Sequence, residues 1–166
     1  MIICRSAAEI ERLRRSGRMA RGLLEELQER AQPGVSTLEL EKYIEKRIAH
    51  LGARSAFKGY RGYPCCLCAS VNSEVIHGIP SGRSLKRGDI LSLDLGVVVD
   101  GYYGDSAITV PVGEILESTQ RLLRVTQEAL QLAIDDHTQI QTEYIAFFEA
   151  ALGGNPVYDL AVHRCA

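Results

Sequence analysis

The stretch DILSLDLGVVVDGYYGDSAITV, residues 89–110, decides the fold because it reads as two β-strands joined by a tight turn. The Asp100-Gly101 pair is a strong indication of a two-residue hairpin loop, since a type I′ turn requires positive φ angles at both central positions. If this turn forms, Val99 pairs with Tyr102. The sequence therefore predicts a long antiparallel hairpin whose register is set by the turn.

Hydrophobic residues alternate along the first of these strands. The predicted apolar face consists of Leu91, Leu93, Leu95, Val97 and Val99. Asp94 shares the opposite face with Ser92 and Gly96. This alternation is typical of a strand that packs one face on a core.

Two acids stand inside these otherwise apolar strands. The predicted register sets Asp94 opposite Ala107, and Asp105 lies two residues from Ala107 on the same face. The backbones of such diagonal neighbours are about 7–8 Å apart, so their side chains can converge on one small object. Two ionised carboxylates on a half-buried sheet repel each other and lose solvation unless cations or donors compensate.

A pair of divalent metal ions would meet that need. Hard and borderline cations take carboxylate oxygens as ligands, and one carboxylate can bridge two ions. The alternative is that both acids face solvent, or bind backbone amides and Arg side chains. The spacing alone does not choose between the two interpretations.

Two helices are predicted before the hairpin. Ser6–Glu9 and Ser36–Glu39 both match the capping box, in which serine and glutamate side chains cap a first turn reciprocally. The first helix should end before Pro33, and the second should run to Gly52. Short β-rich pieces follow, namely SAFKGY (55–60), CLCASV (66–71) and EVIHGIP (74–80). Helices packed on one face of an antiparallel sheet make an α+β domain.

After the hairpin, residues 117–134 read as a third helix with approximate periodicity. The remaining residues, 135–166, contain one short helical stretch, EYIAFFEAAL (143–152), followed by a Gly-Gly-Asn-Pro breaker. These residues hold no strand pair that would complete a sheet.

The composition fits one compact domain, with 166 residues of which 46% are hydrophobic. The net charge of −2 comes from interspersed signs, and the basic cluster at residues 12–21 is modest, so nucleic-acid binding is not indicated. No leader or membrane span is recognisable, which predicts a soluble, cytoplasmic chain. Five cysteines, three of them crowded into PCCLC (64–68), favour reduced thiols.

The segments GYRGYPCCLCASVNSEVIHGIP (59–80) and LKRGDILSLDLGVVVDGYYGDSAITVPVG (85–113) resemble the type I methionine aminopeptidases, a family of pita-bread metallopeptidases. The resemblance runs from the N-terminal helices to about Ile134. It implies that residues 1–134 form the first half of the pita-bread fold, an antiparallel sheet with helices on one face. Residues 135–166 are then a divergent tail.

The resemblance also implies an activity, the metal-dependent removal of the N-terminal methionine from peptides and nascent proteins. In this family two cobalt, manganese, iron or zinc ions hold a bridging water that attacks the first peptide bond. Asp94 and Asp105 match two of the metal ligands. His77 matches the residue that contacts the scissile peptide and stabilises the transition state, and Tyr60, Tyr63 and Cys68 match the pocket for the methionine side chain.

The family has a second half that supplies further metal ligands, and no matching motif occurs after Ile134. The sequence therefore predicts weak metal binding and self-association through an exposed sheet edge. One alternative is an inactive fragment or pseudoenzyme that at most binds peptide N-termini. Another keeps the fold and changes the substrate, as in proline-specific aminopeptidases or creatine amidinohydrolases, but the segment 59–72 is typical of the methionine enzymes.

Overall fold

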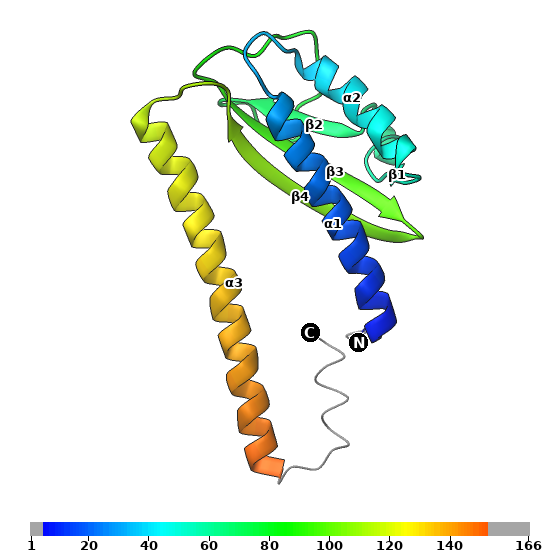
Figure 1. The fold of residues 1–166 in the computed structure, drawn as a ribbon, viewed down its shortest axis with the longest axis vertical. Helices are drawn as coiled ribbons and strands as arrows, with labels where there is room; N and C mark the ends of the chain where they lie inside the picture. Colours follow the sequence, from blue (N-terminus) through cyan, green and yellow to red (C-terminus); the bar gives the residue numbers. More distant parts are fainter. Residues whose placement is uncertain (1–4, 153–166) are drawn as a thin grey trace. The chain divides into compact units, whose positions relative to one another are not determined.

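The computed structural model describes residues 5–152, with residues 136–152 described as helix backbone. The elements in chain order are α1 (Ala7–Arg30), α2 (Thr37–His50), β1 (Arg54–Ser55), the 3₁₀-helix η1 (Tyr60–Gly62), β2 (Leu67–Val71), β3 (Ile90–Val99), β4 (Tyr102–Pro111) and α3 (Glu117–Leu152), as Figure 1 shows. Residues 11–120 form one compact unit that contains the whole sheet. Within the described part of the chain, no helix is long and apolar enough to cross a membrane.

The hairpin that the sequence predicts is present. β3 and β4 pair antiparallel along their whole length, with Val99 opposite Tyr102 at the turn. Asp100 and Gly101 have φ angles of 50° and 83°, the positive values that a type I′ turn requires. The predicted turn and register are both confirmed.

β3 is the central strand of the sheet. β4 occupies one edge of β3 over its full length, so β1 and β2 both pair with the other edge. β1 lies beside residues 97–98 of β3, and β2 lies beside residues 91–95. All of these pairings are antiparallel, as predicted.

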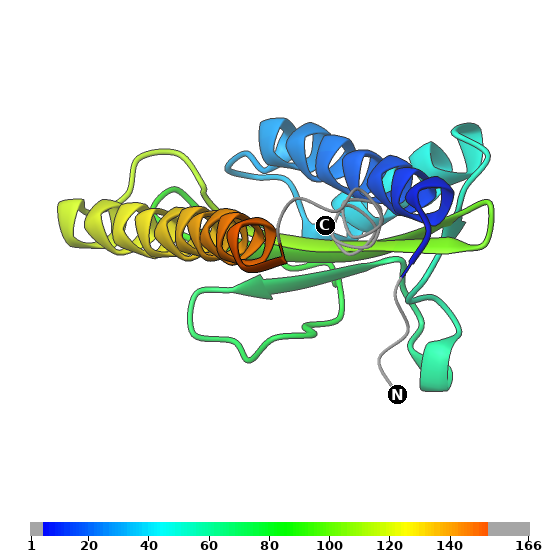
Figure 2. The same ribbon diagram turned by 90° about the horizontal axis from the view of Figure 1, so that it is seen from below.

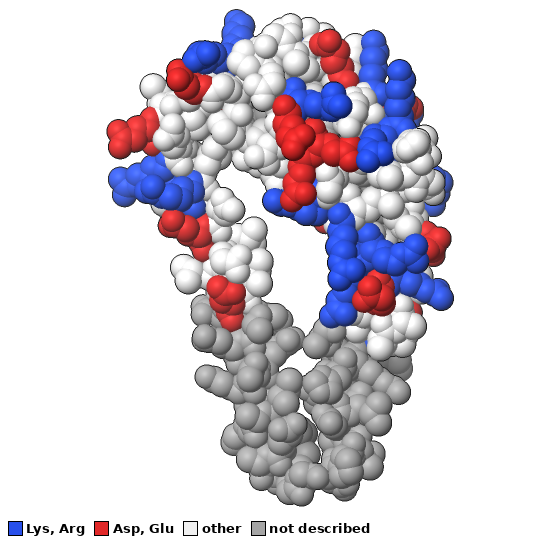
Figure 3. Space-filling model, in the orientation of Figure 1, with Lys and Arg blue, Asp and Glu red and all other residues white. Residues whose placement is uncertain are grey.

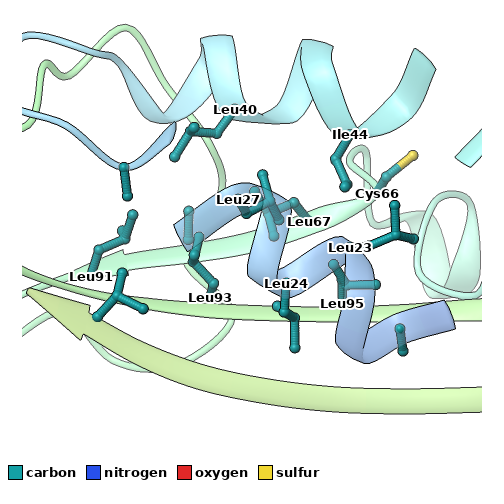
Figure 4. Packing of buried hydrophobic residues seen from close by; sticks show 14 of the residues in the cluster. Leu23, Leu24, Leu27, Leu40, Ile44, Cys66, Leu67, Leu91, Leu93 and Leu95 are labelled. Carbon is teal, nitrogen blue, oxygen red and sulfur yellow. The ribbon is translucent and has the colours of Figure 1, made fainter. Parts of the chain in front are cut away.

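The core lies between the sheet and the helices α1 and α2, which cover one face of the sheet (Figure 2). The predicted apolar face of β3 is confirmed: Leu91, Leu93, Leu95 and Val97 are fully buried, and Val99 is partly buried against the core. Figure 4 shows the three leucines of β3 packed with Leu23, Leu24 and Leu27 of α1, Leu40 and Ile44 of α2, and Leu67 of β2. Burial of each such side chain stabilises the fold by about 1.5–3 kcal/mol.

Both predicted capping boxes are formed. The backbone N–H of Ser6 donates to the Glu9 carboxylate at 2.8 Å, and the backbone N–H of Glu9 donates to the Ser6 hydroxyl at 3.3 Å. Ser36 and Glu39 repeat this arrangement with the same two distances. These contacts satisfy backbone donors that a helix start leaves without an intrahelical partner.

The basic cluster on α1 is interleaved with acids, as the space-filling view in Figure 3 shows. Its exposed ion pairs are Arg14–Glu11, Arg18–Glu11, Arg15–Asp100 and Arg21–Glu25. Exposed pairs of this kind each contribute about 0–1 kcal/mol. The apolar face of α1, rather than its charges, therefore holds the helix on the sheet.

The prediction of β-strands is wrong for two of the three short segments before the hairpin. In the segment 55–60 only Ser55 belongs to a strand, and the segment 74–80 is an irregular loop. The physical reason is the backbone: Gly59 and His77 have φ angles of 87° and 69°, outside the range of extended chain. The apolar composition of both segments suggested strands, but none of their residues belongs to the hydrophobic core cluster.

The third helix is longer than predicted. α3 continues from Glu117 to Leu152 without the expected end near residue 134. No Gly or Pro occurs between residues 117 and 152, so nothing in this stretch interrupts a helix. The boundary between residues 134 and 135 stays a prediction, and residues 153–166 of the predicted tail lie outside the described part of the chain.

The contact between α1 and β4 yields a stability prediction. A Cβ atom on Gly104 would lie 2.3 Å from the backbone carbonyl of Ser16, so we expect Gly104→Ala to lower the free energy of unfolding by about 1–3 kcal/mol. Gly22→Ala is the matched control in α1, where a Cβ meets nothing within 4 Å. It should raise the free energy of unfolding by about 0.5–1 kcal/mol. Urea denaturation measures both, and equal effects of the two substitutions would contradict this contact.

Candidate metal and peptide site

The two aspartates lie on the face of the sheet that points away from the core. Asp94 alternates with fully buried leucines of β3 and lies opposite Ala107 of β4. Asp105 lies opposite Gly96, two positions along β4 from Ala107. The carboxylates are therefore diagonal neighbours on one face, as the sequence predicts.

The structure brings His77 into electrostatic contact with this pair. Burial raises the pKa of Asp94, and the carboxylate of Asp105 raises it further, whereas His77 acts in the opposite direction. Asp94 is half-buried, while Asp105 and His77 are exposed. The arrangement leaves a concentrated negative charge that a cation can approach from solvent.

Cys68 borders the acid pair on the other side. It lies directly opposite Asp94 in β2, so both side chains leave the same face of the sheet. Burial raises the pKa of the Cys68 thiol, and the carboxylates of Asp94 and Asp105 raise it as well, although a hydrogen bond from Tyr63 lowers it. Cys68 is therefore a neutral thiol beside the two acids.

Tyr63 connects three segments of the site. Its single hydroxyl proton is shared between the carbonyl oxygens of Leu67, at 3.0 Å, and Gly78, at 3.2 Å. Burial raises the pKa of Tyr63, and its hydrogen bond with Cys68 adds to this shift. The ring is thus fixed between the start of β2 and the loop that carries His77.

Tyr60 is less enclosed than the other predicted pocket residues. Its side chain is 64% exposed, and the guanidinium of Arg61 lies 5.4 Å from the centre of its ring. The backbone N–H of Tyr63 donates to its carbonyl oxygen at 2.9 Å, so the two tyrosines belong to one turn. The structure therefore brings Tyr63, Cys68, His77 and both aspartates together, with Tyr60 at the solvent-exposed side.

Phe57, to which the sequence pattern gives no role, packs on β3 near the acid pair. A Cβ atom on Gly96 would lie 2.7 Å from its ring, which therefore rests on β3 two residues from Asp94. The backbone N–H of Ala56 donates to the carbonyl oxygen of Gly96 at 2.8 Å and holds the ring there. Gly96 inside the predicted strand could have indicated this contact, because a glycine in a strand often marks a place where another group approaches the backbone closely.

Glu41 of α2 is a second residue to which the sequence pattern gives no role, and it lies on the core side of the sheet. Its carboxylate is 5% exposed and accepts hydrogen bonds from the backbone N–H groups of Cys66 at 2.8 Å and Leu67 at 3.0 Å. Burial raises the pKa of this carboxyl, and the two backbone donors act against that shift. Glu41 thereby joins α2 to the start of the strand that presents Cys68.

The donor set fits a divalent cation in its chemistry. Two carboxylates offer the oxygen ligands that such ions prefer. Among the described residues, no group of three or more His, Cys, Asp or Glu side chains converges as a metal cluster. Asp94 and Asp105 are therefore the neighbouring acids of this part of the chain whose chemistry could hold a metal.

Comparisons with known proteins match this architecture. The profile of metallopeptidase family M24 matches residues 11–151. Methionine aminopeptidase 1 of Bacillus subtilis is 45% identical to this chain over 82% of this chain and 55% of the relative. The methionine aminopeptidase of Clostridium perfringens is 39% identical over 98% of this chain and 68% of the relative. The chain thus spans about half the length of the Bacillus subtilis relative.

Among solved structures, the crystal structure of methionine aminopeptidase from Thermotoga maritima superposes with a TM-score of 0.77 at 40% identity. The match covers 81% of this chain and 54% of that structure. The predicted fold, an antiparallel sheet with helices on one face as in the first half of a pita-bread structure, is thereby confirmed.

Glu41 yields a pH prediction. Because its pKa is raised on folding, the folded chain binds this proton more readily than the unfolded chain. The carboxyl therefore contributes stability below its unfolded pKa, and this contribution is lost as the pH rises through the folded pKa. We expect the free energy of unfolding of the wild type, relative to Glu41→Gln, to fall as the pH rises from about 4 towards neutrality.

Urea denaturation at a series of pH values measures this difference. Glu114→Gln is the matched control, since Glu114 is an exposed glutamate whose side chain is 87% accessible and ion-paired with Arg87. Glu114→Gln, measured over the same range, gives the background against which the change for Glu41→Gln is compared. A level difference for Glu41→Gln would contradict the assignment of a raised pKa to this buried carboxyl.

Proposed function

Because this chain belongs to metallopeptidase family M24, we propose that it acts in the metal-dependent removal of the N-terminal methionine from peptides and proteins. The observation that carries the proposal is the placement of Asp94 and Asp105 as diagonal neighbours on the outer face of the sheet. Cys68 borders the same pair by register, and His77 acts on Asp94 electrostatically. One face of the sheet thus presents two acids and a neutral thiol, and the loop beside it carries an imidazole.

Asp94 and Asp105 are the proposed metal ligands, for a pair of cobalt, manganese, iron or zinc ions. A bound divalent cation supplies Lewis acidity toward the scissile carbonyl group. The chain's own part is to hold two negative charges close together in a sheet whose other face is fully packed. Burial and the neighbouring Asp105 carboxylate raise the pKa of Asp94, and a cation held by the two acids would offset both effects.

His77 is the proposed catalytic residue and also contacts substrate. Its exposed imidazole stands on a loop beside the acid pair, where a ring N–H can donate to the oxygen of the scissile peptide. Negative charge grows on that oxygen in the transition state, so a hydrogen bond aimed at it lowers the barrier. Imidazole suits this task because it can carry a donor near neutral pH.

Tyr63, Cys68 and Tyr60 are the proposed walls of the pocket for the methionine side chain. A thioether packs favourably on aromatic rings and on a neutral thiol, since these groups are polarizable. Tyr63 is anchored through its hydroxyl to Leu67 and Gly78, which keeps its ring in place. The partner is accordingly a peptide or nascent protein that presents a free N-terminus.

A cytoplasmic location and self-association remain predictions. In the described sheet β4 pairs with β3 along one edge, and no further strand is recorded on its other edge. An open strand edge is a template for pairing with another chain. Sedimentation at several protein concentrations would show whether the chain associates.

Metal binding tests the acid pair. We expect manganese or cobalt to bind the 166-residue chain weakly, and Asp94→Asn or Asp105→Asn to weaken binding by about tenfold or more, because each removes one of two charged ligands. Without metal, Asp105→Asn should raise the thermal unfolding midpoint by removing a like charge. Isothermal titration and thermal unfolding measure the two effects, which have opposite signs.

Asp100→Asn is the matched control for this experiment. It changes the same residue type in the same hairpin, at a turn position with a φ angle of 50° that Asn tolerates. Metal binding should be unchanged in this variant. Equal loss of binding in all three variants would show that the acid pair is not the metal site.

Hydrolysis of a Met-Ala-Ser peptide with added manganese or cobalt tests the activity. Where methionine is released, we expect His77→Asn to lower kcat by about a hundredfold, since it removes the imidazole and keeps a residue that tolerates a positive φ angle. His50→Ala, at the exposed end of α2, should leave kcat unchanged. Peptide binding without release of methionine at saturating metal would instead favour the inactive, peptide-binding alternative.

A further inference from the structure

The loop that carries His77 has little apolar packing between Glu74 and Ile79, although Pro80 at its end is buried. Its three branched aliphatic side chains point to solvent, with Val75 82%, Ile76 70% and Ile79 59% exposed. His77 itself has a φ angle of 69°, in the left-handed region that side-chain-bearing residues seldom adopt. Polar contacts therefore contribute much of what keeps this backbone in place.

Ser70 makes polar contacts on both sides of His77. Its hydroxyl donates to the carbonyl oxygen of Val75 at 2.9 Å and accepts from the backbone N–H of Gly78 at 3.1 Å. Ser70 is 4% exposed, so water does not compete freely for either bond. One buried hydroxyl thus joins the residues that flank the turn at His77.

The register of β2 in the sheet orients the Ser70 hydroxyl towards the loop. Ser70 lies in β2 opposite Ser92 of β3, two residues along from Cys68, and so leaves the same face as the acid pair. A Cβ atom on Gly78 would lie 2.5 Å from the carbonyl oxygen of Ala69 and 2.8 Å from the Ser70 hydroxyl. Gly78 therefore packs directly on β2.

Two further bonds complete the attachment. The backbone N–H of Ala69 donates to the carbonyl oxygen of Gly78 at 2.9 Å, and the Tyr63 hydroxyl donates to the same oxygen at 3.2 Å. Both backbone groups of Gly78 are thereby held, and the residue before it is His77. The bond to its N–H is the one that Ser70 supplies.

We propose that Ser70 is a positioning residue for His77. By hydrogen-bonding to the backbone of Val75 and Gly78, the Ser70 hydroxyl fixes the loop and so sets the imidazole over the acid pair. Its effect on catalysis rests on the proposed function, since His77 is the group that would contact substrate. Its effect on the loop does not, because it concerns only the folded chain.

Amide hydrogen exchange of the 166-residue chain tests the proposal. We expect Ser70→Ala to speed exchange of the Gly78 amide by about tenfold or more, because that N–H loses its acceptor. The amides of β3 should exchange as in the wild type. Ser92→Ala is the matched control, since it removes a hydroxyl from the same face that contacts Thr109 and not the loop, and it should leave Gly78 protected.

Ser70→Thr, which keeps a hydroxyl at this position, should also keep Gly78 protected. Unchanged exchange at Gly78 in Ser70→Ala would overturn the proposal, and so would equal loss of protection in Ser70→Thr, which would assign the effect to packing. Loss of β3 protection in Ser70→Ala would make Ser70 a general stabilising residue and would overturn the proposal as well.

A double-mutant cycle tests the catalytic consequence where methionine release is measurable. We expect Ser70→Ala to lower kcat in the wild type and to have no further effect in the His77→Asn background, because Ser70 acts through the imidazole. Additive effects on kcat would overturn that consequence. Absence of methionine release from the wild type would count against the proposed function, while the exchange experiment would still decide the role of Ser70.

Discussion

The antiparallel register of β3 and β4 is the constraint on which the rest of the structure depends. The Asp100-Gly101 turn sets this register, and a slip of one residue would exchange the two faces of the hairpin. In the observed register the leucines of β3 enter the core while Asp94 and Asp105 reach the outer face. The same pairing therefore stabilises the domain and assembles the acid pair.

The acid pair lowers the stability of the folded chain. Burial and the neighbouring carboxylate both raise the pKa of Asp94, which means that the ionised pair opposes folding. The core on the other face supplies the stability that tolerates this repulsion, because every leucine of β3 is fully buried. A bound cation would remove the repulsion. At these two positions, the same pair of charges therefore lowers the stability of the metal-free chain and raises its affinity for a metal.

β2 links the helices to the site through polar groups on both of its faces. On the core side, the Glu41 carboxylate accepts hydrogen bonds from the backbone N–H groups of Cys66 and Leu67. On the outer side, the Ser70 hydroxyl accepts a hydrogen bond from Gly78, in the loop that carries His77. A buried hydrogen bond is costly to leave unmade, so these contacts have one stable geometry. The positions of Cys68 and of the His77 loop on the outer face therefore depend on Glu41 and Ser70, which are not among the proposed metal or peptide ligands.

The sequence by itself determined the features that depend on local patterns. Both capping boxes, the hairpin turn, its register and the shared face of Asp94 and Asp105 follow from neighbouring residues and from the two-residue period of a strand. Only the tertiary structure decided the irregular loop at His77 and the roles of Glu41 and Ser70. Their partners lie on other segments, and a buried hydroxyl or carboxylate has no periodic signature. Which donor satisfies which acceptor is settled only when the chain has folded, because long-range contacts are set by packing and not by spacing along the sequence.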